Sequence, residues 1–169
     1  MRSFLKVVDS ISEWIGLTGR WFAVGLVLIV SLEVILRFVF NRPTLWAYET
    51  SVMMGASVYI LAFGYVHRHR AHVRVDVFHA HLSTRGKAVI DVLGDLLLFF
   101  PLVFLLVLIA WDWVIYAWET GERMPITGWY PPAGPLRTVV FLGLSVFALQ
   151  GVAQFIRDLH LLIRNKPYD

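Results

Sequence analysis

Two apolar runs of the sequence, each about as long as a lipid bilayer is thick, are separated by only a short polar turn. Residues 21–40 and 47–66 are mostly apolar. A helix of 20 residues is about 30 Å long, which matches the hydrocarbon core of a membrane. Asn41 and Pro43 lie between the runs, and both residue types favour turns. The sequence therefore predicts a hairpin of two membrane-spanning helices.

Three charged residues interrupt this hairpin. Glu33 and Arg37 are four positions apart and share one face of the first helix, and Glu49 opens the second helix. Counted from the turn, Arg37 and Glu49 each lie about one helical turn into the membrane, so they can meet across the hairpin. Glu33 lies one turn deeper. Because a lone charge at the bilayer centre costs roughly 2.5–3.5 kcal/mol, we expect either that the three charges satisfy one another or that another protein completes the set.

Two further apolar segments are long enough to span a membrane. Residues 88–118 would be about 46 Å long as a single helix, which is longer than the bilayer core, and Pro101 is expected to kink that helix. Residues 136–156 form the fourth predicted span. The segment between them, 119–135, is rich in Pro and Gly and is predicted to be a short periplasmic loop.

The remaining segments are polar or amphipathic. Within residues 1–16, apolar side chains lie largely on one side at helical spacing, and Lys6, Asp9 and Glu13 lie on the other. This pattern predicts an amphipathic helix that lies in the membrane interface or docks on a partner. The charges also argue against a cleaved signal peptide, because no continuous apolar run precedes the first span. Residues 67–87 are predicted to form a basic cytoplasmic segment.

Composition and charge fix the class and the orientation of the protein. A hydrophobic content of 58% with only 16% charged residues excludes an ordinary soluble domain. Lys and Arg concentrate in the N-terminal segment, in residues 67–87 and in the C-terminal tail, which places both termini in the cytoplasm. We therefore predict an all-α integral membrane protein, a single membrane domain over residues 1–169, with four transmembrane helices and an N-terminal interfacial helix. The net charge of +3 is too small to suggest nucleic-acid binding.

Tryptophan residues near the ends of the predicted spans are expected to anchor the protein at the lipid headgroups, because Trp is enriched at membrane interfaces. The predicted anchors are Trp14, Trp21, Trp46, Trp113, Trp118 and Trp129. Membrane lipids are therefore among the expected partners.

The sequence argues against three kinds of chemistry: metal or haem binding, conduction of ions or protons, and nucleophilic catalysis. Five of the six histidines lie within residues 67–81, but they alternate with arginines that repel a cation, and no histidine lies in a span where haem needs axial ligands. The acidic residues of the spans do not form a continuous path for ions or protons, because they lie toward the two membrane interfaces and leave the middle of the bilayer without them. They are Glu33, Glu49, Asp91, Asp95 and Asp112. The chain has no cysteine and no nucleophile motif, so we expect neither an enzyme, a metal site nor a cofactor.

The order of motifs resembles a known family. The hairpin SLEVILRFVFNRPTLWAYET contains an arginine before an aromatic-Val-Phe-Asn turn, at residues 37–41, and an acid, Glu49, just inside the second helix. The sequence RHRAHVRVDVF follows, with a His-hydrophobic-Arg-Val-Asp signature at His72, Arg74 and Asp76. A Leu-Gln-Gly element occurs at residues 149–151. Over about residues 20–160, the chain is similar to the small, Q-type (DctQ-like) membrane subunit of tripartite ATP-independent periplasmic (TRAP) transporters.

The resemblance implies a subunit that is not an enzyme and that pairs with a large multi-span TRAP membrane subunit in a bacterial or archaeal inner membrane. A periplasmic substrate-binding protein would deliver organic acids or related solutes, and a sodium gradient would drive uptake. The sodium and substrate sites would belong to the large subunit, and the small one would brace it. Two alternatives from other classes are a haem-bearing electron-transfer subunit and a self-sufficient small transporter.

Overall fold

A computed structural model describes residues 2–69, 84–164 and 168, and its regular elements are helical apart from one isolated bridge. The elements are α1 (Arg2–Phe38), α2 (Trp46–Arg68), α4 (Thr84–Gly94), the π-helical turn η1 (Asp95–Phe99), α5 (Phe100–Thr120) and α6 (Gly134–Arg164). Within these residues four helices are long and apolar enough to cross a membrane, with α4, η1 and α5 counted as one. The prediction of an all-helical protein with four helices of membrane-spanning length is therefore confirmed.

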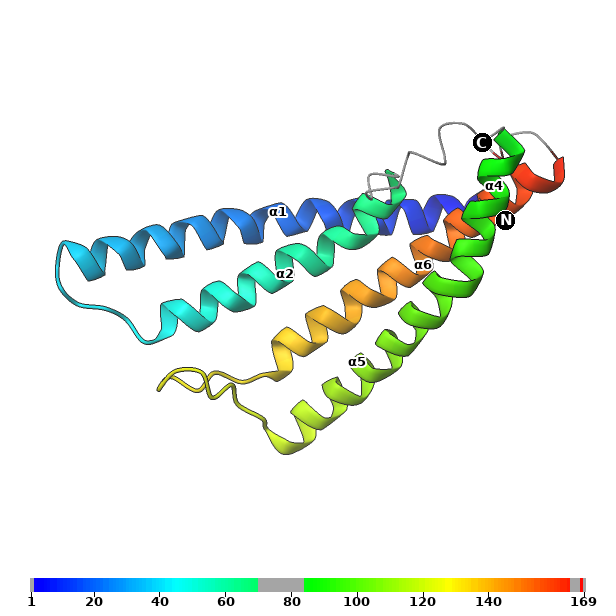
Figure 1. The fold of residues 1–169 in the computed structure, drawn as a ribbon. Coiled ribbons are helices and arrows are strands. Elements are labelled where there is room, and N and C mark those ends of the chain that lie inside the picture. The colour runs from blue at the N-terminus through cyan, green and yellow to red at the C-terminus, as the bar shows by residue number, and fades with distance from the viewer. Residues whose placement is uncertain (1, 70–83, 165–167, 169) are drawn as a thin grey trace.

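The helices are arranged as a row. α2 packs between α1 and α6, and α6 packs between α2 and α5 (Figure 1). Both termini lie at one end of this bundle, which we call the termini end, and the turn at residues 39–45 and the loop at residues 121–133 lie at the other, the hairpin end. At the termini end α1 also contacts α6. Two helices, α1 and α5, thus form the outer members of the row.

The N-terminal residues do not form a separate interfacial helix, so that prediction is wrong. α1 runs without a break through all 37 residues from Arg2 to Phe38, about 55 Å of helix. Its first turns bury Leu5 and Val8 in a cluster with Ala153 of α6. The apolar pattern of residues 1–16 is therefore explained in part by packing against the chain's own last helix. No proline interrupts the helix to separate the two halves.

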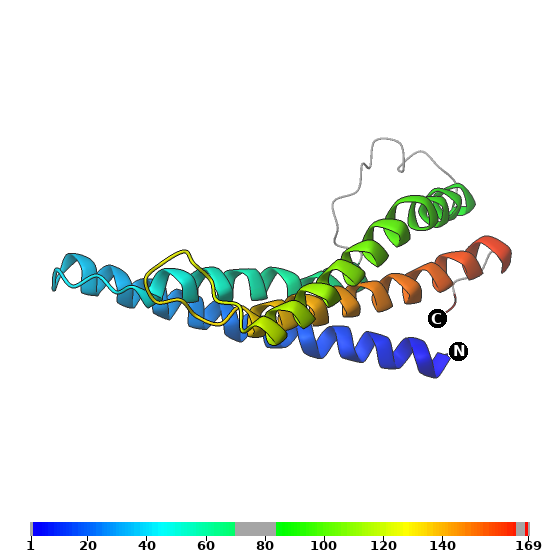
Figure 2. The same cartoon turned by 90° about the horizontal axis from the view of Figure 1, so that it is seen from below.

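The third spanning helix changes geometry in its first half. In η1 the backbone N–H of Phe100 donates to the carbonyl of Asp95, five residues earlier, as in a π-helix. Pro101 follows immediately, and it has no N–H with which to continue the α-helical pattern. The irregularity predicted at Pro101 therefore takes the form of a π-helical turn that ends two residues before the proline. Figure 2 shows α4 and the start of α5 leaning away from α1 and α6 at the termini end.

Two glycines of α6 allow its neighbours to approach closely. A Cβ atom added at Gly143 would lie 2.8 Å from the backbone oxygen of Ile60 in α2. A Cβ added at Gly151 would lie 2.1 Å from the ring of Phe99. Small residues at such crossings are how membrane helices reach close van der Waals contact. The two glycines therefore set the distances of α2 and of the η1 turn from α6.

Candidate functional site

Glu33 and Arg37 form an ion pair near the hairpin end. The Nη2 and Nε atoms of Arg37 donate to Glu33 Oε1 at 2.6 and 3.1 Å. The second oxygen of Glu33 accepts from the hydroxyl of Thr44 at 2.6 Å and from its backbone N–H at 3.2 Å. Glu33 thereby joins the last turns of α1 to the chain that enters α2. The Arg37 side chain remains about half exposed (52%), whereas that of Glu33 is 14% exposed.

Glu49 is fully buried in the first turn of α2. Its Oε1 accepts a 2.5 Å hydrogen bond from the backbone N–H of Thr127, in the loop before α6. The positive end of the α2 dipole also favours a carboxylate at this position. The other oxygen, Oε2, is buried and has no hydrogen-bond partner among the described residues. The carboxylate therefore fastens the 121–133 loop to the start of α2.

The structure does not bring Arg37 and Glu49 together, so the predicted contact across the hairpin is wrong. Arg37 turns back along its own helix, because Glu33 at i−4 is within direct reach. Glu49 is turned toward the loop and Thr127 instead. Two of the three charges thus satisfy each other within the chain, and the third is held by a backbone donor 78 positions away.

The 121–133 loop is also fixed to α5 and α6. Arg137 Nη2 lies 2.6 Å from Glu122 Oε1, and Arg137 Nη1 donates to the carbonyl of Trp113 at 3.2 Å. The guanidinium lies 5.3 Å from the centroid of the Trp113 ring, within the range of a cation–π contact. An isolated bridge pairs Arg123 with Pro132 and closes the loop on itself. The loop is therefore folded and is attached to the ends of α5 and α6 at the hairpin end.

A second polar cluster, which we call the three-helix network, lies at the termini end. Ser12 and Gln150 are both fully buried, and the Ser12 hydroxyl donates to Gln150 Oε1 at 2.7 Å. The amide of Gln150 donates to Asp9 Oδ1 at 3.0 Å. Arg157 Nη2 lies 2.6 Å from Asp9 Oδ2. These bonds join α1 to α6.

α2 completes the three-helix network. Arg68 Nη1 donates to the carboxylate of Glu13 and, at 3.1 Å, to the backbone carbonyl of Asp9. Its Nε lies 3.9 Å from Asp9 Oδ1. His69 Nε2 lies 3.3 Å from the same Glu13 oxygen, which makes it a second contact from the end of α2. The polar side of the N-terminal helix therefore faces protein at these positions.

Sequence reasoning missed the three-helix network. From the sequence, Asp9 and Glu13 belong to the polar side of a helix that is predicted to lie in the membrane interface or to dock on a partner, and Gln150 belongs only to the Leu-Gln-Gly element. A signal was present, however. Gln150 is a polar residue inside an apolar span, and such residues usually face other helices rather than lipid.

The cytoplasmic segment is described only in part. His72, Arg74 and Asp76 lie outside the described residues. His67, which was predicted to belong to a basic surface, instead stacks on the ring of Phe99 at 5.1 Å and meets Phe147 edge-on at 5.3 Å. This histidine thus belongs to an aromatic contact among α2, η1 and α6.

Most of the predicted tryptophan anchors are exposed on the bundle, as contact with lipid requires. The exposed ones are Trp14 (74%), Trp21 (66%), Trp113 (57%), Trp118 (62%) and Trp129 (46%), and Trp46 is half-buried. Trp118 also donates its indole N–H to Thr138 Oγ1 at 3.0 Å, which fixes its ring against α6. Their role as interface anchors stays a prediction.

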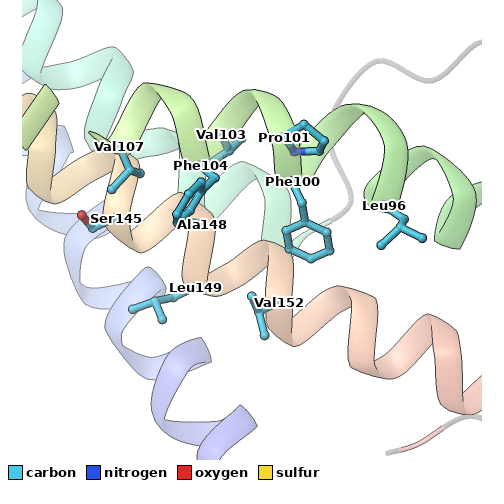
Figure 3. Close-up of a pocket in the computed structure, with 10 residues that line it drawn as sticks. All are labelled: Leu96, Phe100, Pro101, Val103, Phe104, Val107, Ser145, Ala148, Leu149 and Val152. Atoms are coloured by element: carbon cyan, nitrogen blue, oxygen red, sulfur yellow. The ribbon is translucent and has the colours of Figure 1, made fainter. Parts of the chain in front are cut away.

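A groove of about 620 Å³ lies between α5 and α6 (Figure 3). Its walls are hydrocarbon and aromatic side chains, together with Ser145, whose hydroxyl already donates to the carbonyl of Phe141 at 2.8 Å. Such a lining suits acyl chains or apolar side chains and offers no charged group to an organic acid. Among the described residues, no group of three or more His, Asp or Glu side chains gathers closely enough to hold a metal ion.

Comparison with known proteins gives one informative match. A family model described as "Tripartite ATP-independent periplasmic transporters, DctQ component" matches residues 26–161. The matched stretch runs from the last third of α1 through α2 and the 121–133 loop to within three residues of the end of α6. No individual curated protein gives a significant match.

Proposed function

The chain belongs to the DctQ family, the small component of tripartite ATP-independent periplasmic (TRAP) transporters, and we propose that it braces the large membrane subunit of such a transporter. It is a multi-pass membrane protein with four membrane-length helices among its described residues. In the proposed role, the chain stays static while the larger subunit carries out the movements of transport.

The observation that carries this proposal is the arrangement of the helices in a row. A row in which α2 and α6 are the inner members does not enclose a polar chamber between its helices. The groove between α5 and α6 is apolar. Several charged groups at the two ends of the bundle pair within the chain, as Glu33 does with Arg37 and Asp9 does with Arg157. A route for a charged solute is therefore better assigned to another chain.

The remaining parts of the proposal follow from the family and from charge. We place the chain in the inner membrane of a bacterium or archaeon. Both termini face the cytoplasm in this proposal, because Lys and Arg are concentrated in the N-terminal segment, in residues 67–87 and in the C-terminal tail. A periplasmic binding protein delivers an organic acid or related solute to the large subunit, where the sodium and substrate sites lie. The tryptophan residues anchor the small subunit at the membrane interfaces.

Individual residues receive two proposed roles. Glu33, Arg37 and Glu49 shape the hairpin end so that it fits the large subunit, since they fix the α1–α2 turn and the 121–133 loop. His72, Arg74 and Asp76 form a cytoplasmic contact surface. Neither role involves catalysis.

Reconstitution in liposomes tests the proposed function. Vesicles that contain the chain, a large TRAP subunit from the same organism and its binding protein should take up a labelled organic acid when sodium is supplied outside. Vesicles with only this chain should take up none, and vesicles that lack it should show reduced uptake. Uptake by this chain alone would overturn the proposal.

A further inference from the structure

One face of α2 is largely uncovered by the other residues that the structure describes. Four of its large side chains are exposed there, at spacings of four, seven and four residues that place them on one side of the helix. They are Tyr48 (57%), Val52 (39%), Tyr59 (73%) and Phe63 (37%), and the ring of Phe63 also contacts Phe147 of α6, with the two centroids 5.5 Å apart. Gly55 lies among them, and nothing lies within 4 Å of the point where its Cβ would be. We call these five residues the α2 outer face.

The α2 outer face carries a polar group near the middle of a helix of membrane-spanning length. Tyr59 is two residues beyond the middle of the 23-residue helix, so its hydroxyl lies far from both ends. No described residue forms a hydrogen bond with that hydroxyl. Lipid chains offer no acceptor, and a polar group that is unpaired in hydrocarbon is unfavourable. Tyr59 therefore indicates a surface that is covered by protein.

A second polar group adjoins the α2 outer face near the hairpin end. Tyr48 and Ser51 line a groove of about 300 Å³ together with Arg37 of α1. Arg37 uses Nε and Nη2 on Glu33, whereas its Nη1 makes no hydrogen bond to a described residue, and the side chain is half exposed. A guanidinium with unpaired N–H donors is stabilised by oxygen acceptors beside it. The groove thus extends the α2 outer face toward the guanidinium of Arg37.

The outer side of α5 provides the contrast. Its exposed large residues from the π-turn to the middle of the helix have only hydrocarbon side chains, which lipid can solvate. They are Leu97, Leu98, Leu102, Leu105, Leu106, Leu108 and Ile109. The α2 outer face differs in bearing tyrosine hydroxyls, an open notch at Gly55 and an adjoining arginine. Hydrogen-bonding groups together with a small residue are the features by which membrane helices associate.

We propose that a transmembrane helix of the large transporter subunit packs along the α2 outer face. One of its side chains enters the notch at Gly55, an oxygen acceptor near mid-membrane receives the hydroxyl of Tyr59, and a second acceptor near the hairpin end receives Arg37. The complementarity between these donors and the partner's oxygens selects a protein helix over lipid chains. This inference rests on the proposed function and adds which surface performs it.

Paired glycine substitutions test the proposal. Gly55 and Gly94 are both helical, and an added Cβ meets open space at both positions, so a larger side chain begins without a clash at either one. With a tagged large subunit, Gly55→Leu should reduce the recovered complex about ten-fold or more, because leucine fills the notch. Gly94→Leu should leave recovery unchanged. Tyr59→Phe, which removes only the hydroxyl, should reduce it about five-fold.

The outcomes separate this inference from the function on which it rests. If wild-type chain and large subunit co-purify and the Gly55→Leu and Tyr59→Phe variants do so equally well, the α2 outer face is not the interface, although the bracing role stands. If the wild-type chain does not co-purify, the bracing role itself fails. Unchanged thermal unfolding of the isolated Gly55→Leu variant confirms that its fold is intact.

Photo-crosslinking identifies the occupant directly. A photoreactive amino acid at position 59 or 98 samples two equally exposed sites, because Tyr59 and Leu98 are both 73% exposed. The proposal expects a crosslink to the large subunit from position 59 and much less from position 98. A crosslink from position 59 to a second copy of this chain, a crosslink only to lipid, or stronger protein crosslinking from position 98 would each overturn it.

Discussion

The side-chain amide of Gln150 donates a 3.0 Å hydrogen bond to Asp9 Oδ1, which joins two residues 141 positions apart in the sequence. Gln150 is fully buried and also accepts from the Ser12 hydroxyl. The first turns of α1 are therefore an integral part of the bundle and are joined through polar contacts to α6. In the proposed bracing role, such a connection adds rigidity to the subunit.

The Ser12–Gln150 bond can be tested by a double-mutant cycle. Gln150→Leu should lower the free energy of unfolding by roughly 1–3 kcal/mol, because it leaves the buried Ser12 hydroxyl without its acceptor. Ser12→Ala should lower the free energy of unfolding less in the Gln150→Leu variant than in the wild-type chain, because the hydrogen bond between the two residues is already absent in that variant. Unfolding in mild detergent with added denaturing detergent measures both values. Strictly additive losses would contradict the bond.

The close contact at Gly143 predicts a sharp difference between two glycine-to-alanine variants. Gly143→Ala places a methyl group 2.8 Å from the Ile60 backbone oxygen, so the two helices must separate, and we expect a loss of about 1–3 kcal/mol in unfolding free energy. Gly55→Ala meets open space and should stay within about 0.5 kcal/mol of the wild type. Equal effects in the isolated chain would show that α6 does not lie against α2 at this point.

Glu49 should control the exchange of one backbone amide. Glu49→Ala removes the acceptor of the Thr127 N–H, so exchange of that amide with deuterium should become about five-fold faster or more. Glu119→Ala removes an exposed acid just before the same loop and serves as the control, with no change expected at Thr127. Slow exchange at Thr127 in the Glu49→Ala variant would mean that the loop is fixed by other contacts.

Loss of Arg37 should weaken assembly with the large subunit. Arg37→Ala leaves Glu33 without its cation, although the two Thr44 bonds remain, and recovery of the complex should fall several-fold. Adding Glu33→Gln neutralises the stranded carboxylate and should restore part of the loss. Arg42→Ala, at an exposed position in the turn, is the matched control. If Arg42→Ala weakens recovery as much as Arg37→Ala does, the effect is not specific to the ion pair.

Features that depend on local composition could be predicted from the sequence. The four spanning helices follow from the lengths of the apolar runs, and the family follows from the order of motifs around Arg37 and Glu49. The sequence spacing also placed Glu33 and Arg37 on one face, where they do pair. Each of these inferences needs only residues that are near one another in the chain.

Contacts between distant segments could not be predicted. An amphipathic helix buries its apolar side equally well in a membrane interface or against another helix, so residues 1–16 did not reveal their contact with α6. The partner of Glu49 is a backbone N–H, which every residue except proline carries, so no residue type pointed to Thr127. Helix lengths alone likewise gave no order for the row of helices.

The most direct test of the bracing role is whether this chain is found in a complex with a larger membrane protein. The chain should be produced together with a tagged large TRAP membrane subunit from the same organism, extracted in mild detergent and passed over a size-exclusion column. We predict that both proteins elute in one peak, and that the chain alone elutes later. If the chain elutes at the same late position whether or not the large subunit is present, the account is wrong.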